Sequence, residues 1–160
     1  MNKFEKVSFY QYNNLIGGDV DLKPEYEAIK LPCRATAGSA GYDFFAPFAF
    51  DLSPGETITI PTGIRVLLDD DKYLMIVPRS GLGFKYRVQL DNSVGIIDAD
   101  FSQSDNGGHI MIKLTNDTHE NKTVHIKAGQ GIAQGIINQY FKTYDDSTNG
   151  CLLYTSETII

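Results

Sequence analysis

Short runs of apolar residues, or of alternating apolar and polar residues, recur every dozen residues or so along this chain. Glycine, proline, asparagine and aspartate bound most of these runs, as they commonly bound strands in β proteins. Long helical periodicity, with apolar residues three or four positions apart, is hard to find. We therefore predict strands at the following ranges: 26–31, 41–47, 56–68, 73–78, 88–90, 109–116, 122–126 and 131–141.

Many short strands without long helices indicate an all-β domain, which would be a sandwich, a jelly roll or a barrel. The segment 80–87, SGLGFKYR, could hold a short helix despite its two glycines. We divide the chain into an N-terminal extension (1–25), a β-domain (26–144) and a C-terminal tail (145–160). The sequence shows neither an internal repeat nor a linker between two domains.

Charge and composition narrow the function. The net charge is −6 and the chain has no block of lysine or arginine, so direct binding to nucleic acid is not expected. It has no run of about 18 apolar residues and no apolar signal-peptide core, which predicts a cytoplasmic protein that does not bind membranes. Cys33 and Cys151 lie far apart without neighbouring ligand residues, which fits neither a disulfide framework nor a zinc site.

Two short stretches carry candidate chemistry. The sequence PRSGLG (78–83) ends an apolar strand with a cation, a hydroxyl and two glycines, so that backbone N–H groups could approach an anion closely. A strand exit with a solvated Arg79 explains the same residues equally well. In GIIDADFSQ (95–103), Asp98 could be an ordinary turn residue. Beside Ile96, Ile97 and Phe101, however, its carboxylate would be partly desolvated and suited to act as a general base.

The three histidines, His109, His119 and His125, have no metal-ligand spacing, and Ser80 has no recognisable partners for a catalytic triad. Gln134, in the glycine-rich stretch GQGIAQG (129–135), could be an ordinary edge residue. Taken one at a time, these stretches leave the function open.

Taken together and in order, four stretches resemble the motifs of the trimeric dUTPase family, the dUTP diphosphatases. The resemblance covers roughly residues 28–143, and the stretches are LPCRATAGSAGYDFFAP, PRSGLG, DNSVGIIDADF and KAGQGIAQ. It implies a jelly-roll-type β-barrel, a homotrimer whose active sites form between subunits, and hydrolysis of dUTP to dUMP and pyrophosphate.

The resemblance also implies roles for residues of the third motif. Asp98 would activate the water that attacks the α-phosphorus and would hydrogen-bond the sugar 3′-hydroxyl. A ring at Phe101, where most members have tyrosine, would leave no room for a ribose 2′-hydroxyl. The residues of a hairpin that reads the uracil edge, and of the next strand that closes its pocket, would be Asn92, Gly95, Ile96, Ile97 and Met111.

The remaining implied roles concern the triphosphate. Arg79, Ser80 and Gly81 would bind phosphate, as would Gln134 in the fourth motif. Asp43 would support Mg²⁺ through water, while the triphosphate supplies the direct metal ligands.

Two departures from the family pattern keep alternatives open. The fourth motif usually carries an acidic residue and an arginine where this chain has Gln130 and Gly131, and no glycine-rich fifth motif is visible in the tail, which offers Tyr154 as an aromatic. A nucleotide-binding or regulatory protein with weak turnover is therefore an alternative. A related dCTP deaminase is another, although that relative uses a glutamate and the third motif here has none nearby.

Overall fold

Buried and exposed side chains alternate along most strands, as expected for sheets that turn one face to the core. Strand β9 (Met111–Asn116) shows this pattern, since Ile112, Leu114 and Asn116 are buried and Lys113 is exposed. The computed structural model describes residues 1–16 and 21–147. Over these residues the predicted all-β class is confirmed, and the fold is of jelly-roll type.

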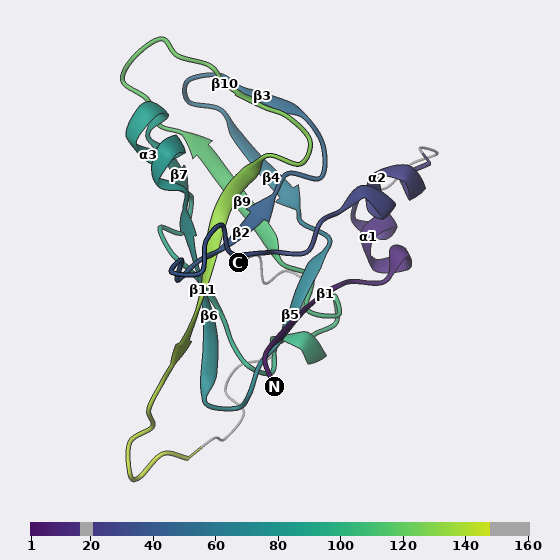
Figure 1. Ribbon diagram of the computed structural model, residues 1–160, viewed down its shortest axis with the longest axis vertical. Helices are drawn as coiled ribbons and strands as arrows, with labels where there is room; N and C mark the ends of the chain where they lie inside the picture. Colours follow the sequence, from purple (N-terminus) through teal and green to yellow (C-terminus); the bar gives the residue numbers. More distant parts are fainter. Residues whose placement is uncertain (17–20, 148–160) are drawn as a thin grey trace.

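Four antiparallel groups of strands build the molecule (Figure 1). The largest sheet has the order β2-β11-β6-β8, and the second has the order β4-β9-β7, while β1 pairs with β5 and β10 pairs with β3. The strand bounds are β1 Lys3–Lys6, β2 Tyr42–Phe45, β3 Phe50–Leu52, β4 Thr57–Pro61, β5 Ile64–Leu67, β6 Lys72–Pro78, β7 Val88–Leu90, β8 Gly95–Ile97, β10 Val124–Ile126 and β11 Gly131–Gln139.

Apolar side chains from all four groups meet in one core, whose burial is the main source of stability. Its fully buried members come from strands far apart in the sequence and include Phe44, Ile60, Leu74, Ile97, Ile112 and Ile132. Strand β11 lies between β2 and β6, so the last described strand completes the middle of the largest sheet.

Three helices accompany the sheets in residues 1–16 and 21–147. Helix α3 (Ser80–Tyr86) confirms the helix considered for 80–87. Helices α1 (Phe9–Ile16) and α2 (Lys23–Ala28) lie together on the side of the sheets opposite α3, and a 3₁₀ turn, η1 (Phe101–Gln103), follows β8 (Figure 1). No helix in the described part of the chain is long and apolar enough to cross a membrane.

Two strand predictions were wrong. The run 26–31 overlaps the end of helix α2, because Pro24 and Glu25 suit the first turn of a helix and Tyr26 packs on Tyr12 of α1. The run 56–68 is not one strand: it breaks between β4 and β5 at Gly63, whose φ of +70° is a conformation that side chains rarely adopt.

The N-terminal residues, which the sequence indicated only as an extension, contribute to the core. Strand β1 pairs with β5 along its whole length, from Lys3 opposite Leu67 to Lys6 opposite Ile64. Its Phe4, and Val7 and Tyr12 beyond it, are buried in the common core. The first 16 residues therefore pack as part of the β fold.

Candidate functional site

Arg79 links three separate segments of the chain. It lies between the end of β6 and the start of α3, and its side chain forms an ion pair with Asp43 of β2, with Nε 3.4 Å from Oδ1. Its Nη1 also donates to the backbone oxygen of Gly131 on β11, at 3.5 Å. Because the Asp43 side chain is only 12% exposed, the pair holds the guanidinium in place at the edge of a cavity.

The sheet brings Gln134 to the same place. In β11 it lies opposite Asp43 on one side and opposite Val77 of β6 on the other. Gly41 makes room for its side chain, because a Cβ at that position would lie 2.9 Å from Gln134 Oε1. Asp43 is fixed by its backbone, whose N–H donates to the oxygen of Cys33 at 2.8 Å. The structure thus brings together residues predicted from three different motifs.

Ser80 and Gly81 begin helix α3 directly after Arg79. The N–H groups of Leu82 and Gly83 donate back to Arg79 O at 3.1 and 3.0 Å, so the amides of Ser80 and Gly81 precede the first hydrogen bond of the helix. The N–H groups of such amides have no acceptor within the helix, and a bound anion can accept from them. Nothing lies within 4 Å of the position that a Cβ on Gly81 would take, so this turn is open on that side.

These residues line a cavity of about 450 Å³, which we call the Arg79 cavity. Its lining residues are Arg79, Ser80, Gly81, Leu82, Lys85, Tyr86, Val124, His125, Gln130, Gly131 and Gln134. Lys85 and His125 were not predicted. The alternation in VHI (124–126) places His125 on the exposed face of β10, and the fold brings it to this cavity. Its Nδ1 contacts Asp51 Oδ1 of the neighbouring strand β3 at 2.6 Å.

The third motif lies elsewhere in the subunit. We expected Asn92 in a hairpin, but the flanking strands do not pair with each other: β7 pairs with β9 and β8 pairs with β6. The turn between them therefore joins two sheets. Its start is held by the Asp91 N–H, which donates to Lys113 O at 3.2 Å, and Met111 lies on the same face of β9 as Lys113.

Residues of this motif differ widely in exposure. Gly95 and Ile97 are buried, whereas Asn92 and Ile96 are exposed. Gly95 and Ile97 pair with Ile76 and Leu74 of β6, which fixes the backbone of β8. The backbone amides expected to read a base are thus carried on a short strand at the edge of the largest sheet.

Asp98 follows β8 and lines a second cavity of about 800 Å³, which we call the Asp98 cavity. Asp70, Asp100 and Tyr140 line it as well. The prediction that Ile96, Ile97 and Phe101 partly desolvate Asp98 does not hold in the single subunit, where Asp98 is exposed. Of the neighbouring apolar residues, Ile97 and Phe101 are buried in the core and Ile96 is exposed.

Phe101 is 2% exposed and belongs to the core. Its N–H donates to Asp98 O at 3.2 Å, so the ring anchors the backbone directly after the carboxylate. A role of this ring against a sugar stays a prediction. Replacement by alanine would also remove core packing, so selectivity between sugars is better tested with Phe101→Leu.

The two cavities are distant from each other within one chain. Ile97, the residue before Asp98, pairs with Leu74 of β6. Gln134 pairs with Val77, which lies three residues further along β6. Strand geometry then separates Ile97 from Gln134 by about 10 Å along β6 and about 10 Å across it. A single subunit does not place Asp98 beside Arg79 and Gln134.

The donors near the Arg79 cavity suit a metal that arrives with a ligand. Among residues 1–16 and 21–147, no three His, Cys, Asp or Glu side chains gather to hold a metal ion. Asp43 is engaged by Arg79, and hard cations such as Mg²⁺ prefer oxygen ligands and retain several waters. The arrangement fits a Mg²⁺ held by a polyphosphate, with Asp43 contacting it through water.

Part of the sequence prediction falls outside the described residues. The missing fifth motif and the aromatic Tyr154 belong to the segment beyond residue 147. Within the described chain, Phe141 and Tyr144 are the exposed aromatics that follow β11, and Phe141 lines the Asp98 cavity.

Comparisons with known proteins find similar sequences and structures. The family model for dUTPase matches residues 27–150. A deoxyuridine 5′-triphosphate nucleotidohydrolase from Hahella chejuensis is 39% identical over 132 residues, which cover 76% of this chain and 82% of the relative. The crystal structure of dUTPase from Streptococcus mutans is 30% identical, with a TM-score of 0.67, and the match covers 88% of this chain and 97% of that one.

A more distant structure shares the fold alone. It is a point mutant of the dUTPase from phage phi11 of S. aureus, at 18% identity and a TM-score of 0.66, and the match covers 93% of this chain and 97% of that one. That structure is described as revealing the coordination of a structural Mg(II) ion.

Proposed function

This chain belongs to the dUTPase family, and we propose that it hydrolyses dUTP to dUMP and pyrophosphate with Asp98 activating the attacking water. The observation that carries the proposal is that residues of three motifs come together: Arg79 and Gln134 line one cavity, and Asp43 forms an ion pair with Arg79 and lies opposite Gln134 in the sheet. A cation and an amide in the cavity, with a carboxylate behind them, match the groups that the family uses on a triphosphate.

The Arg79 cavity would bind the phosphates. Arg79 supplies a planar cation whose N–H groups fit phosphate oxygens, and Asp43 holds it in position. The amides of Ser80 and Gly81 and the side chain of Gln134 add uncharged donors. These fixed donors orient the triphosphate for in-line attack on the α-phosphorus.

Asp98 would act on the water and the sugar. Asp98 is exposed in the single subunit and lines the Asp98 cavity, and a general base must lie within hydrogen-bonding distance of the proton it accepts. Asn92 and the backbone of Gly95, Ile96 and Ile97 would read the uracil edge. A tight fit there excludes the methyl group of thymine.

The proposal includes Mg²⁺ bound to the triphosphate, with Asp43 contacting it through water. When bound, Mg²⁺ neutralises the charge that builds on the leaving pyrophosphate. The protein's own part is to hold Asp43 and Arg79 in one ion pair. The position of Asp43, which would contact Mg²⁺ through water, and that of Arg79, which would contact phosphate directly, are therefore fixed relative to each other.

We also propose a homotrimer with shared sites in the cytoplasm, where the nucleotide pool lies. Support comes from the distance between the two cavities, because Asp98 must reach the same triphosphate as Arg79 and Gln134. A second copy that places its Asp98 at the Arg79 cavity would complete the site.

Gly131 favours a second candidate, a dUTP-binding protein with weak turnover. Where the family usually has an arginine, this chain has a glycine over which Arg79 lies. The fourth motif therefore supplies no cation of its own to the cavity, where Arg79 and Lys85 are the basic side chains among the lining residues. Such a protein would bind dUTP without releasing pyrophosphate. The other alternative, a dCTP deaminase, would be recognised by release of ammonia from dCTP.

The test is the Asp98→Asn variant, assayed for pyrophosphate release over a panel of nucleoside triphosphates. Asparagine keeps the shape and a hydrogen bond to the sugar but cannot accept the proton, so kcat for dUTP should fall by about 100-fold or more with little change in binding. Hydrolysis at a near wild-type rate would remove Asp98 from the mechanism.

A further inference from the structure

Helix α1 lies before residue 27, where the family match begins, yet it packs against the segment that follows Asp98. We call residues 98–110, between β8 and β9, the Asp98 loop. We propose that α1 is a positioning element for this loop, with Tyr12 and Gln11 setting where Asp98 lies for catalysis. This inference rests on the proposed function, because it assigns Asp98 the role of base.

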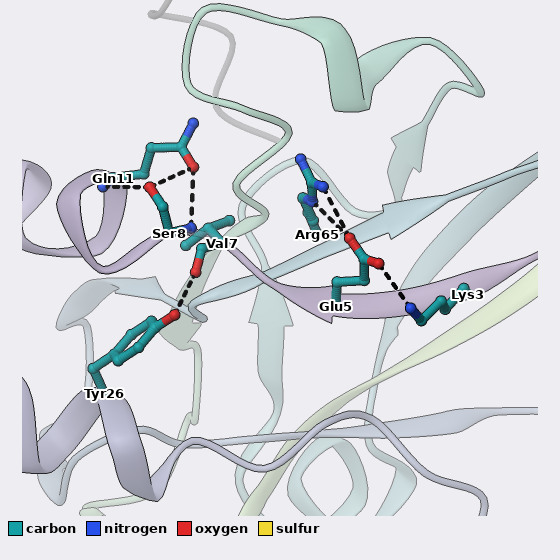
Figure 2. A network of polar contacts seen from close by, with 7 residues as sticks. All are labelled: Lys3, Glu5, Val7, Ser8, Gln11, Tyr26 and Arg65. Atoms are coloured by element: carbon teal, nitrogen blue, oxygen red, sulfur yellow. Dashed lines mark hydrogen bonds and ion pairs between the residues drawn. The ribbon is translucent and has the colours of Figure 1, made fainter.

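The start of α1 is fixed to the sheet. Val7 N–H donates to Gly63 O at 2.9 Å, and Tyr26 Oη of α2 donates to Val7 O at 2.7 Å. Figure 2 shows the contact between Tyr26 and Val7. Beside it, Glu5 of β1 contacts both Lys3 and Arg65. The helix therefore begins at a point that the turn between β4 and β5 determines.

A capping box sets the direction of the helix. Ser8 Oγ accepts from Gln11 N at 3.2 Å, and Gln11 Oε1 accepts from Ser8 N at 3.2 Å (Figure 2). This reciprocal pair satisfies two backbone N–H groups at the helix start. It also fixes the Gln11 side chain, which lies directly against Gly107 of the Asp98 loop. A Cβ on Gly107 would be 1.8 Å from Gln11 Nε2.

Tyr12 forms the second contact with the Asp98 loop. It is fully buried, and its ring centroid lies 6.0 Å from that of His109, which is also fully buried. The Tyr12 hydroxyl donates to Glu25, and burial together with this contact raises the pKa of Tyr12. The phenol therefore stays a donor, and the ring has one fixed orientation against the loop.

Gly63 connects the start of helix α1 with the Asp98 loop. Its oxygen accepts from Val7, and its N–H donates to Nε2 of His109 at 2.8 Å. The helix start and the far end of the Asp98 loop are thus bound to the same residue. Ile110 adds to this anchor, because its N–H donates to Ile64 O at 2.9 Å.

The far end of the loop is rigidly joined to the residues next to Asp98. Asn106 Oδ1 accepts from the N–H groups of Gly108 and His109, and Asn106 Nδ2 donates to His109 O. Gly108 lies so close to Ser102 that a Cβ on Gly108 would be 2.6 Å from the Cα of Ser102. Ser102 follows Phe101, whose N–H donates to Asp98 O.

A contiguous set of contacts therefore runs from α1 to the catalytic carboxylate. Displacement of Gly107 or His109 would move Ser102 and Phe101, and with them the backbone of Asp98. A base displaced by about 1 Å can lose up to about 100-fold in rate. Ground-state binding by the Arg79 cavity would be unaffected, because none of its lining residues contacts α1 in this set.

The experiment compares Tyr12→Leu with Tyr10→Leu. Tyr10 lies on the same helix and is 72% exposed, so it controls for changes in α1 that do not reach the loop. We expect Tyr12→Leu to lower kcat about tenfold while the Kd for α,β-imido-dUTP changes less than about twofold. Tyr12→Phe, which keeps the ring, should restore most of the rate.

Three results would overturn the inference: an unchanged kcat in folded Tyr12→Leu, an equal loss in Tyr10→Leu, or a loss of analogue binding equal to the loss of kcat. If Tyr12→Leu does not fold, Gln11→Ala removes the other contact between α1 and the loop, because the Gln11 side chain lies against Gly107. The same kcat loss without loss of analogue binding is expected, and an unchanged kcat there would overturn the inference.

A double mutant separates this inference from the proposed function. If α1 acts through Asp98, Tyr12→Leu should cost little further activity in an Asp98→Asn background, because the effects of coupled residues do not add. An equal loss in both backgrounds would overturn the positioning role alone. A nearly active Asp98→Asn single variant would instead overturn the proposed function.

Discussion

At the scale of single residues, the departure at Gly131 has a structural explanation. Arg79 occupies the space above this glycine, with its Nη1 2.5 Å and its Cζ 3.0 Å from the position that a Cβ would take. A side chain at 131 and the present position of Arg79 therefore exclude each other. The glycine at 131, where the resemblance to the family leads us to expect an arginine, and the placement of Arg79 between Asp43 and Gly131 go together in this chain.

Gly131→Ala tests this explanation. The added methyl group should push the guanidinium away from Gly131 O and from Asp43, which weakens the grip on phosphate. We expect KM for dUTP to rise about threefold to tenfold, or up to about 1.4 kcal/mol, with kcat near wild type. Steady-state kinetics measure this, and a thermal melt confirms folding. An unchanged KM would mean that Arg79 does not need this position.

His109 predicts a dependence of stability on pH. Burial lowers the pKa of His109 from 6.5 to about 4, so the folded protein favours the neutral ring. This contribution is complete above pH 6.5 and is lost as the pH falls from 6.5 towards 4, by roughly 3 kcal/mol in total. Chemical denaturation at a series of pH values measures it.

His109→Gln is the matched control, since its amide oxygen can still accept from Gly63 N–H but does not titrate. Carboxylates that titrate in the same range remain in both proteins. The difference in free energy of unfolding between the two should therefore shrink as the pH falls from 6.5 to 4. A constant difference would contradict the buried neutral histidine.

At the scale of elements, the capping box of α1 carries a prediction of its own. Ser8→Ala removes the oxygen that accepts from Gln11 N, which should cost about 1 kcal/mol of unfolding free energy. Urea denaturation measures the change, and Ser8→Thr, which keeps a hydroxyl, should lose much less. Equal losses in both variants would show that the cap does not stabilise the helix.

The elements that the sequence predicted well are those with a long alternating pattern. Strands β6, β9 and β11 have six to nine residues and clear turns at their ends. Strands β1, β3 and β8 were missed because three or four residues carry too little periodicity. Helix α2 was taken for a strand because its short run fits either period, while Pro24 and Glu25 in its first turn and its contact with α1 favour the helix.

The candidate site was predictable where a motif is continuous in sequence. Arg79, Ser80 and Gly81 follow one another, so their common position needed no tertiary information. Lys85 and His125 reach the same cavity only through the packing of α3 and β10, which no local pattern encodes. The exposure of Asp98 was not predictable either, because only the folded sheets place Ile97 and Phe101 in the core and leave Asp98 outside it.

At the scale of the whole molecule, exposed apolar side chains agree with assembly. Phe84 on α3 is 94% exposed, and Val94 and Ile96 beside the third motif are also exposed. If the protein is a trimer, light scattering should give about three times the 17.7 kDa subunit mass. A fully active monomer would contradict shared sites.

Mixing two inactive variants tests the shared site directly. Asp98→Asn and Arg79→Ala should each abolish turnover, but if each site takes these residues from different subunits, each mixed trimer regains one active site, which is about a quarter of all sites in a random equal mixture. The double variant Asp98→Asn, Arg79→Ala expressed alone should stay inactive. If both residues serve from the same chain, mixing restores nothing.

The position of β11 has a consequence for biosynthesis. This strand lies between β2 and β6 but is the last of the described strands to be made. At about 5–20 residues per second, the ribosome releases β11 on the order of ten seconds after β2, and until then the edges of β2 and β6 that it will cover stay unpaired. Open strand edges can pair with other nascent chains. A chaperone that binds extended apolar segments would therefore act on this protein before residue 139 leaves the exit tunnel.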